Sequence, residues 1–455
     1  MLNKNVFKSF FNNQILIFFI FLILLFIQNY IFCIMYTADH LNPSLIDDDG
    51  NYVLNRVAFS FGQYYDVILN NKTPTIELYG ISLPSLRRPV LPHSILFLYE
   101  NITTNFILIH LIKNFFFGII IFYLIKNFNH KYNYLFLSIC LFIIFYNPHN
   151  AVTNLGTENE EGILNYLIII LFFLLISEYK FKSIYLSIVL CLIFLLKGSM
   201  FLLSIFIPII FLLVEKKTKY KYLPIVILII TNISWGLINM KTSGFFAIGP
   251  KGSAMNAINL ATITHKHFNI TYPEIRPDIH RSHEVEKIVL ANDIKTEKEL
   301  INVLLSNSKK YILENPYEYF IGVLKKIYVL NFSPFKDAQY PKDPAKYMEN
   351  IFNAKHEANE KIYNPIRYSN IPNKIVFNLS LVILLFSVIK FKNNSNFMNK
   401  LNLYYLFILA LYLAPYMFAW IYPRHATSIY ILSHFYLVIV IIEKNIFNIR
   451  KFITS

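Results

Sequence analysis

Long apolar runs recur along the chain, separated by short polar connections. A helix that crosses a bilayer needs about 20 apolar residues, and fewer where neighbouring protein covers its ends. Because these runs continue from the first part of the chain to the last, we expect an all-α polytopic membrane protein of about ten transmembrane helices. The expected spans lie near residues 14–36, 106–125, 132–146, 163–177, 183–196, 199–214, 222–240, 375–389, 401–419 and 427–442.

The overall composition supports this interpretation. Of the 455 residues, 55% are hydrophobic and 15% are charged, whereas water-soluble domains carry roughly 25% charged residues. The formal net charge is +15, and the basic residues are concentrated in the connections between apolar runs. No basic groove interleaved with stacking aromatic residues is visible, which excludes nucleic-acid binding as the reason for the charge.

The basic residues occupy every second connection, as expected when positively charged loops stay on the cytoplasmic side of a membrane. Both termini are therefore predicted to be cytoplasmic. The basic connections contain Lys4 and Lys8, then Lys126 and Lys131, then Lys180 and Lys182, then Lys216, Lys217, Lys219 and Lys221, then Lys390, Lys392 and Lys400, and finally Lys444, Arg450 and Lys451.

The remaining connections are predicted to lie on the extracytoplasmic side and divide the chain into three parts. Residues 1–240 form an N-terminal transmembrane module, whose first outer loop spans about 37–105. Residues 241–374 form an extracytoplasmic loop domain, which we expect to be small and helical. Residues 375–455 form the C-terminal transmembrane helices.

Two helices are predicted inside the outer loop domain. The stretch Thr296-Glu297-Lys298-Glu299 predicts a capping box at the start of the first, because the threonine hydroxyl and the second glutamate can satisfy free amides there. Pro316 is expected to open the second helix. Its apolar stripe, with Lys325 and Lys326 near headgroup level, indicates a helix that lies on the membrane surface.

Three consecutive acids, Asp47, Asp48 and Asp49, follow the first expected span. Burying an acid cluster in lipid costs several kcal/mol, so these side chains are predicted to face water or a polar cavity. A carboxylate in such a position can act as a general base on a hydroxyl. The alternative is that an aspartate caps a helix that starts at the membrane surface.

Several cations and acids are predicted to share the extracytoplasmic side. Arginine suits bidentate contact with phosphate, although Arg88 could equally belong to a basic rim at the headgroups. Lys197 stands where a lysine is disfavoured, which indicates either an anionic partner such as phosphate or a side chain that snorkels to the surface. The other candidates are Glu158, Glu160 and Glu161 at the head of the fourth span, and Arg424 with His425 in the last outer turn.

This arrangement resembles the GT-C class of polyprenyl-phosphate-sugar glycosyltransferases, which includes protein O-mannosyltransferases, aminoarabinose transferases and bacterial mannosyltransferase-like relatives. Asp48-Asp49-Gly50-Asn51-Tyr52 is similar to an acidic pair followed by tyrosine in that class. Arg88-Pro89-Val90-Leu91-Pro92 resembles its proline-rich entry to the second span. The glutamates at 160–161, the run that ends at Lys197, and Tyr422-Pro423-Arg424-His425 are similar to further motifs, with His425 where tyrosine is common.

The resemblance implies a GT-C-like bundle with juxtamembrane helices outside the membrane, in a bacterial inner membrane. It also implies a single inverting displacement, in which Asp48 activates an acceptor hydroxyl and polyprenyl phosphate leaves. Lys197 and Arg424 would contact the donor phosphate, and Asp49 with Glu161 would shape the sugar site. Asp47, Tyr52, Arg88, Glu160 and His425 complete the expected substrate-binding set.

Metal dependence differs among members of the class, so no cofactor follows from the resemblance. If a divalent metal takes part, Asp48 and Glu161 are the expected ligands. The implied partners are the polyprenyl-phosphate-sugar donor, a glycan, lipid or protein acceptor, and membrane lipids.

Three other functions fit part of the pattern. A transporter or flippase of lipid-linked or anionic solutes would use the same cations without a base. Charged residues within the spans would favour it, but Lys113 is the only one there. An O-antigen ligase or polymerase would rely on outer-loop arginines without an acid pair after the first span. The chain could also be a non-catalytic assembly subunit.

Overall fold

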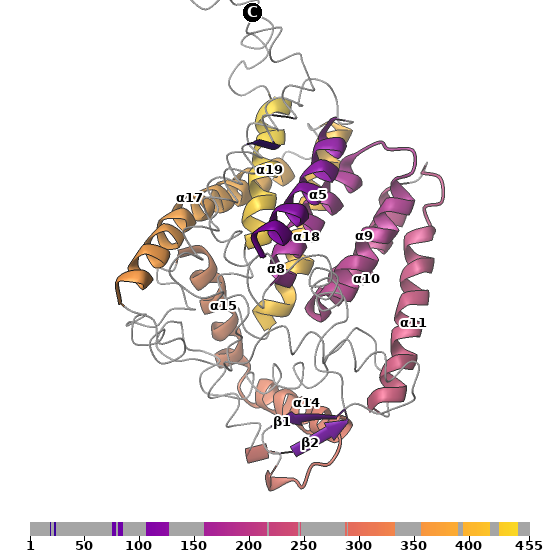
Figure 1. Ribbon diagram of the computed structural model, residues 1–455, viewed down its shortest axis with the longest axis vertical. Coiled ribbons are helices and arrows are strands. Elements are labelled where there is room, and N and C mark those ends of the chain that lie inside the picture. The colour runs from indigo at the N-terminus through magenta and orange to yellow at the C-terminus, as the bar shows by residue number, and fades with distance from the viewer. Residues whose placement is uncertain are drawn as a thin grey trace, which may run out of the picture.

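The computed structural model describes residues 19, 22–23, 75–78, 81–84, 106–126, 159–215, 218–243, 246, 287–288, 290–332, 356–389, 395–418 and 427–444. These residues are helical apart from one short hairpin (Figure 1). The helices are α5 (Phe106–Lys126), α8 (Asn159–Ile176), α9 (Lys182–Leu196), the 3-10 turn η2 (Gly198–Met200), α10 (Phe201–Val214), α11 (Leu223–Ser243), α14 (Glu297–Glu314), α15 (Pro316–Phe332), α17 (His356–Ile389), α18 (Asn396–Phe418) and α19 (Thr427–Lys444).

Eight of the ten expected spans coincide with helices in the described part of the chain, namely α5, α8, α9, α10, α11, α17, α18 and α19. Three of them are long and apolar enough to cross a membrane, over Leu223–Lys241, Pro372–Ile389 and Asn396–Phe418. These helices indicate a membrane protein. Of the other two expected spans, 14–36 and 132–146, the structure describes only residues 19, 22 and 23.

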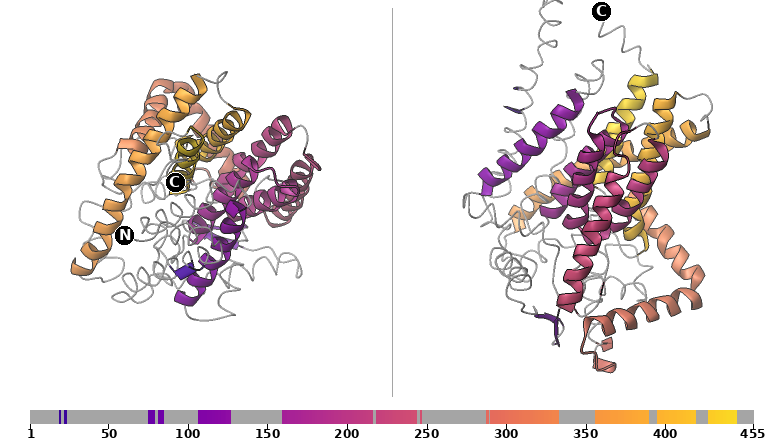
Figure 2. Two further views of the ribbon diagram at one scale, coloured as in Figure 1. Left: turned by 90° about the horizontal axis from the view of Figure 1, so that it is seen from above. Right: turned by 90° about the vertical axis from the view of Figure 1, so that its right-hand side faces the viewer.

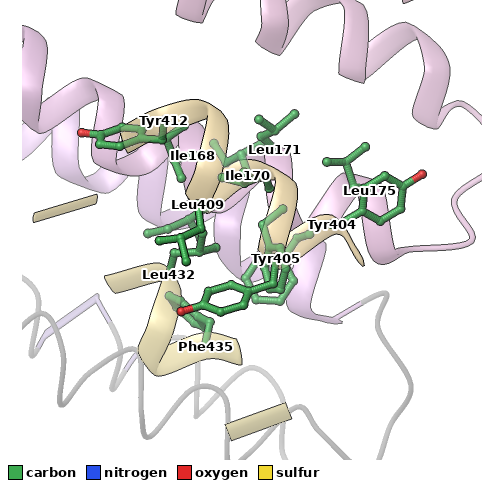
Figure 3. Packing of buried hydrophobic residues seen from close by; sticks show 14 of the residues in the cluster. Ile168, Ile170, Leu171, Leu175, Tyr404, Tyr405, Leu409, Tyr412, Leu432 and Phe435 are labelled. Carbon is green, nitrogen blue, oxygen red and sulfur yellow. The ribbon is translucent and has the colours of Figure 1, made fainter. Parts of the chain in front are cut away.

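Helix α8 lies at the centre of the bundle, between α5, α9, α18 and α19. Every residue over Ile163–Ile176 is buried, which is expected for a helix that is apolar on all sides. Aromatic and aliphatic side chains of α18 and α19 pack against it, including Tyr405, Leu409, Leu432 and Phe435 (Figure 3). The packed interior of the molecule is therefore built around α8.

The outer faces of the surrounding helices are as apolar as their inner faces. On α11, for example, Ile229, Ile233 and Leu237 are about half exposed. A water-soluble helix would carry polar residues on that face. Lipid is therefore the solvent that suits the surface of this bundle.

The helix ends gather at two opposite ends of the bundle. We call one the basic end: α8 and α10 end there, α9, α11 and α18 begin there, and Lys182, Glu215 and Lys400 lie there. The other is the outer-loop end, where α9, α11 and α18 end and α8, α10 and α19 begin. Helix α14 lies beyond the outer-loop end, in the lower part of Figure 1 and of the right-hand view of Figure 2.

The outer loop domain contains the two helices that the sequence predicts. Helix α14 begins with the expected capping box: the Glu299 amide donates to Thr296 Oγ1 at 3.3 Å, and the Thr296 amide donates to Glu299 Oε2 at 3.1 Å. Leu300 and Leu304 face inward and are fully buried. Pro316 is the first residue of α15, where the amide hydrogen that proline lacks would have no acceptor within the helix.

Helix α15 differs from the expected surface helix in one respect. Tyr317 and Phe320 are exposed, which agrees with a stripe that meets the membrane, but α15 also packs against α17 and α18. Lys326 is buried, and its Nζ donates to the carbonyl of Met417 at 3.3 Å. The Lys326 side chain is therefore buried in the protein, where its amine caps the end of α18, and does not extend along the surface as the sequence suggested.

The first outer loop contributes a small hairpin that the sequence analysis did not predict. Strands β1 (Thr75–Leu78) and β2 (Ile81–Pro84) pair antiparallel, with Leu78 opposite Ile81. Two residues, Tyr79 and Gly80, connect the strands, and a two-residue connection ending in glycine is typical of such hairpins. The hairpin lies in the lower part of Figure 1, toward the outer-loop end of the molecule.

Candidate functional site

Lys197 is the one predicted site residue whose side chain the structure describes. Asp47, Asp48, Asp49, Tyr52, Arg88, Arg424 and His425 lie outside the described residues, as does Glu158. Glu160 and Glu161 are in the first turn of α8, and only their backbone is described. The geometry of the candidate site therefore starts from Lys197 and from the helix ends around it.

Lys197 ends α9 at the outer-loop end of the bundle. Its backbone is extended, with φ −147° and ψ 114°, and its amide donates to the Ile193 carbonyl at 3.2 Å. The Lys197 carbonyl then accepts from the Met200 amide at 3.0 Å and so starts η2. The chain reverses sharply at this point, which leaves the half-buried lysine between the end of one helix and the start of the next.

The ammonium group of Lys197 lies over an aromatic ring from α18. Its Nζ is 5.7 Å from the centre of the Tyr416 ring, within the range of a cation–π interaction. The Tyr416 hydroxyl is 3.4 Å from Ser199 Oγ in η2, and either oxygen can donate. Tyr416 is therefore in contact with the reversal on both sides of Gly198.

A chain of buried polar groups continues from Tyr416 through the bundle. The Tyr416 ring packs at 5.7 Å from the ring of Tyr412, and the Tyr412 hydroxyl donates to Ser428 Oγ at 3.2 Å. Ser428 in turn donates to Asn165 Oδ1 on α8. We call Asn165, Ser428, Tyr412, Tyr416 and Ser199 the polar chain. It joins α8, α19, α18 and η2 at the outer-loop end.

The polar chain brings together the helix ends that carry three separate sequence predictions. Asn165 lies one helical turn after Glu161 in α8. Ser428 is the second residue of α19, immediately after the 419–426 connection that contains Arg424 and His425. Tyr416 lies near the end of α18, before the same connection, and contacts Lys197.

Helix α15 contacts the same end of α18 from the outer loop domain. The Tyr319 hydroxyl donates to the Phe418 carbonyl at 3.1 Å, next to the bond from Lys326 to Met417. Burial lowers the pKa of Lys326 to about 6. At neutral pH this amine is therefore mostly uncharged. Its main contribution is then the hydrogen bond that it donates to the end of α18.

The electrostatic character of the outer-loop end suits an anion. Helices α8, α10 and α19 all begin there, and the amides at a helix start carry a partial positive charge that attracts phosphate groups. Lys197 adds a full charge beside the start of α10. Among the described residues no group of three His, Cys, Asp or Glu side chains could hold a metal ion. The side chains of the predicted ligands Asp48 and Glu161 lie outside the described part of the chain.

Sequence reasoning missed the polar chain. Asn165 carried a usable signal, because an amide within an apolar span is costly unless it has a partner. Tyr412 and Tyr416 carried no comparable signal in a chain with 32 tyrosines. The chain matches no protein-family model, and no curated protein or solved structure is detectably similar to it.

Proposed function

We propose that this chain is an integral-membrane glycosyltransferase that moves a sugar from a polyprenyl-phosphate donor to a hydroxyl acceptor. The reaction would take place at the outer-loop end, on the extracytoplasmic side of the membrane. The observation that carries the proposal is the position of Lys197: its ammonium lies over Tyr416 at the start of the polar chain. A lysine beside several helix starts is a suitable site for the phosphate of a lipid-linked donor.

The proposed reaction is a single displacement at the anomeric carbon of the donor sugar. Asp48 accepts the proton of the acceptor hydroxyl, and the hydroxyl oxygen forms the new glycosidic bond. The bond between the anomeric carbon and the phosphate oxygen breaks, and its electron pair leaves with the polyprenyl phosphate. Attack from the face opposite to the leaving group inverts the anomeric configuration.

Lys197 and Arg424 have the same proposed task, which is to stabilise the charge that develops on the departing phosphate. Such charges act more strongly where water is excluded, and the buried polar chain is water-poor. Asp49 and Glu161 are proposed to bind the sugar. The apolar faces of the neighbouring helices supply a surface suited to the polyprenyl tail.

The test is a profile of lipid-linked sugars in a strain of the native host that lacks this gene. We expect one polyprenyl-phosphate sugar to accumulate, because its consumer is missing. Wild-type protein should restore the normal profile, whereas Asp48→Asn and Lys197→Ala should not, at equal protein levels in the membrane. Lys309→Ala is the control, since Lys309 is an exposed residue of α14 and should restore the profile fully.

The outcome also separates an enzyme from a transporter. A flippase that uses the cations alone would lose function in Lys197→Ala but keep it in Asp48→Asn. Full restoration by Asp48→Asn would therefore remove the proposed base, and an unchanged profile in the deletion strain would contradict the use of a lipid-linked donor.

A further inference from the structure

The basic end of the bundle contains a buried cluster of charges that the proposed function does not use. Glu215, immediately after α10, accepts from Lys182 Nζ at 2.7 Å and from Thr218 Oγ1 at 3.0 Å through Oε2. Lys400 of α18 pairs with the other oxygen of the same carboxylate. We call Lys182, Glu215 and Lys400 the lysine cluster; it ties together α9, α10 and α18.

The lysine cluster has an excess of positive charge. Two ammonium groups share one carboxylate, and the Lys182, Glu215 and Lys400 side chains are 4%, 12% and 19% exposed. Lys182 also donates to the neutral carbonyl of Ser177 and lies over the ring of Phe211, neither of which carries a charge. One positive charge in this largely buried group is therefore not balanced by a described acid, and burial makes such an imbalance costly.

A buried hydroxyl beside the cluster also lacks an acceptor. Tyr404 lies one helical turn after Lys400 on α18. The residue is fully buried, and its hydroxyl has no hydrogen-bond partner among the described residues. Figure 3 shows the Tyr404 side chain extending past Leu175. An anion at this end would provide both the missing charge and the missing acceptor.

The surrounding surface adds further positive charge. The described connections at this end, together with the lysine cluster, hold five lysines against two glutamates; these are Lys180, Lys182, Lys219, Lys221 and Lys400, with Glu178 and Glu215. Lys180 and Lys219 are exposed at the surface. An anion that approaches this end therefore meets attraction before it reaches the cluster.

Aromatic residues indicate that this end lies at the level of lipid headgroups. Tyrosines are enriched where a bilayer meets water, because the ring is apolar and the hydroxyl is polar. Five aromatic side chains at this end are exposed, and two of them lie next to the ammonium groups of Lys180 and Lys221; the five are Tyr123, Phe181, Tyr185, Tyr220 and Tyr222. Exposed Ile184 and Ile188 continue the apolar surface along α9, away from this belt.

We propose that the basic end binds the headgroup of an anionic phospholipid, with the lipid phosphate beside Lys400 and within reach of Lys219 and Lys221. The exposed aliphatic face of α9 would accept the acyl chains. A phospholipid fits better than a soluble anion because this end combines an excess of positive charge with exposed aromatic and aliphatic side chains, and only an amphiphile matches both. Basic pockets between transmembrane helices are known to suit such headgroups. This inference does not depend on the proposed enzymatic activity.

The test is a titration of purified full-length protein in neutral detergent with fluorescent phosphatidylglycerol, compared with fluorescent phosphatidylcholine. We expect saturable binding of phosphatidylglycerol and at least tenfold weaker binding of phosphatidylcholine. Lys400→Gln should weaken phosphatidylglycerol binding about fivefold, and Lys219→Gln combined with Lys221→Gln about 25-fold, at about fivefold for each lysine removed near an anionic headgroup.

Lys309→Gln combined with Lys310→Gln is the matched control, because both lysines are exposed on α14 beyond the outer-loop end. This variant should bind phosphatidylglycerol like the wild type, and all variants should share the wild-type melting temperature within a few degrees. Tyr404→Phe gives a second readout that leaves the lysines in place, and it should weaken binding without lowering stability.

Three results would overturn the proposal. One is equal affinity for phosphatidylglycerol and phosphatidylcholine. Another is a loss of phosphatidylglycerol binding in the α14 control variant as large as the loss in the variants of the basic end. The third is full displacement of phosphatidylglycerol by millimolar inorganic phosphate, which would assign the cluster to a free anion instead of a lipid.

Discussion

Lys197 and Tyr416 come from distant parts of the chain, yet the Lys197 ammonium lies 5.7 Å from the centre of the Tyr416 ring. This contact joins the α9–α10 reversal to the end of α18. A lysine held against a ring has fewer conformations to lose when it binds an anion than a lysine that extends freely into solvent. The ring therefore positions the cation that we propose for the donor phosphate.

Substitution of Tyr416 tests this positioning. We expect Tyr416→Leu to raise the KM for the lipid-linked donor about 2- to 30-fold, the range of one cation–π interaction. Tyr416→Phe keeps the ring and should stay near the wild-type KM, although it loses the hydroxyl and its 3.4 Å contact with Ser199. The measurement is donor-dependent transfer by the purified protein in vesicles. A similar rise in both variants would assign the effect to the hydroxyl instead of the ring.

The polar chain is expected to contribute to stability through Ser428. Its hydroxyl connects Tyr412 of α18 with Asn165 of α8. Ser428→Ala should reduce the free energy of unfolding by about 0.6–1.7 kcal/mol, as for other hydrogen bonds between transmembrane helices. Ser187→Ala is the matched control, because that buried hydroxyl donates to the Ser183 carbonyl of its own helix. The free energies of unfolding of the two variants in mixed micelles should therefore differ. Equal losses would argue against a role of the polar chain in holding the helices together.

Glu215→Gln should destabilise the basic end strongly. Two largely buried lysines lose their shared carboxylate, and breaking a buried ion pair from one side costs about 3–5 kcal/mol. The exposed pair of Lys310 and Glu314 is the comparison, and Glu314→Gln should cost less than about 1 kcal/mol. Denaturant titration of both variants provides the measurement. A small effect at Glu215 would mean that solvent or lipid replaces the carboxylate.

The same carboxylate predicts a dependence of stability on pH. Burial acts to raise the pKa of Glu215, but hydrogen bonds from Lys182 and Lys400 outweigh it and hold the pKa below its ordinary value of 4.5. A carboxyl with a lowered pKa stabilises the fold above that ordinary value, and this stabilisation is lost as the pH falls below it. The wild type should therefore lose stability on acidification below about pH 4.5 more steeply than Glu215→Gln.

Lys326 predicts a pH dependence in another range. Its pKa is about 6 in the folded protein against an ordinary 10.5, so between these values the unfolded chain binds a proton that the folded chain does not. Stability should then rise with pH across this window, up to about tenfold in the folding constant per pH unit. Lys326→Met should lack the rise, whereas Lys310→Met on the exposed surface should keep it. The measurement is the melting temperature of the wild type and of both variants between pH 6 and 9. A rise of the same size in Lys326→Met and in the wild type would contradict the prediction.

The predicted orientation can be tested at two exposed lysines on opposite ends of the molecule. Lys219 lies at the basic end, and Lys309 lies on α14 beyond the outer-loop end. In a background with the three native cysteines replaced by alanine, Lys309→Cys should react with a membrane-impermeant maleimide added to intact cells. Lys219→Cys should react only after the cells are opened. The reverse pattern would invert the topology and the proposed location of the reaction.

Local features of the sequence were sufficient for the positions of the helices. Apolar runs of suitable length predicted α5, α8, α9, α10, α11, α18, α19 and the part of α17 after residue 374, and the capping box and Pro316 predicted α14 and α15. These signals are local because a helix and its caps are formed by residues within a few positions of one another. The two-residue connection at Gly80 was a local signal of the same kind, and it was overlooked.

The candidate site could be predicted only in part. Lys197 was identified because a lysine on the side where lysines are disfavoured needs a partner, but its position over Tyr416 could not be read from the chain. Lys326 was assigned to the membrane surface because its neighbours form an apolar stripe. Its burial against Met417 depends on how α15 crosses the end of α18.

The amino-acid sequence by itself determined that this is a helical membrane protein with basic and acidic connections in alternation. Tertiary structure alone decided that α8 is central, that Asn165 reaches Ser428, and that one glutamate pairs with two lysines. The physical reason is that helices in a bilayer are apolar toward both lipid and protein. Their periodicity therefore carries little information about which face packs inward, and the contacts of the few polar side chains depend on residues far away in the chain.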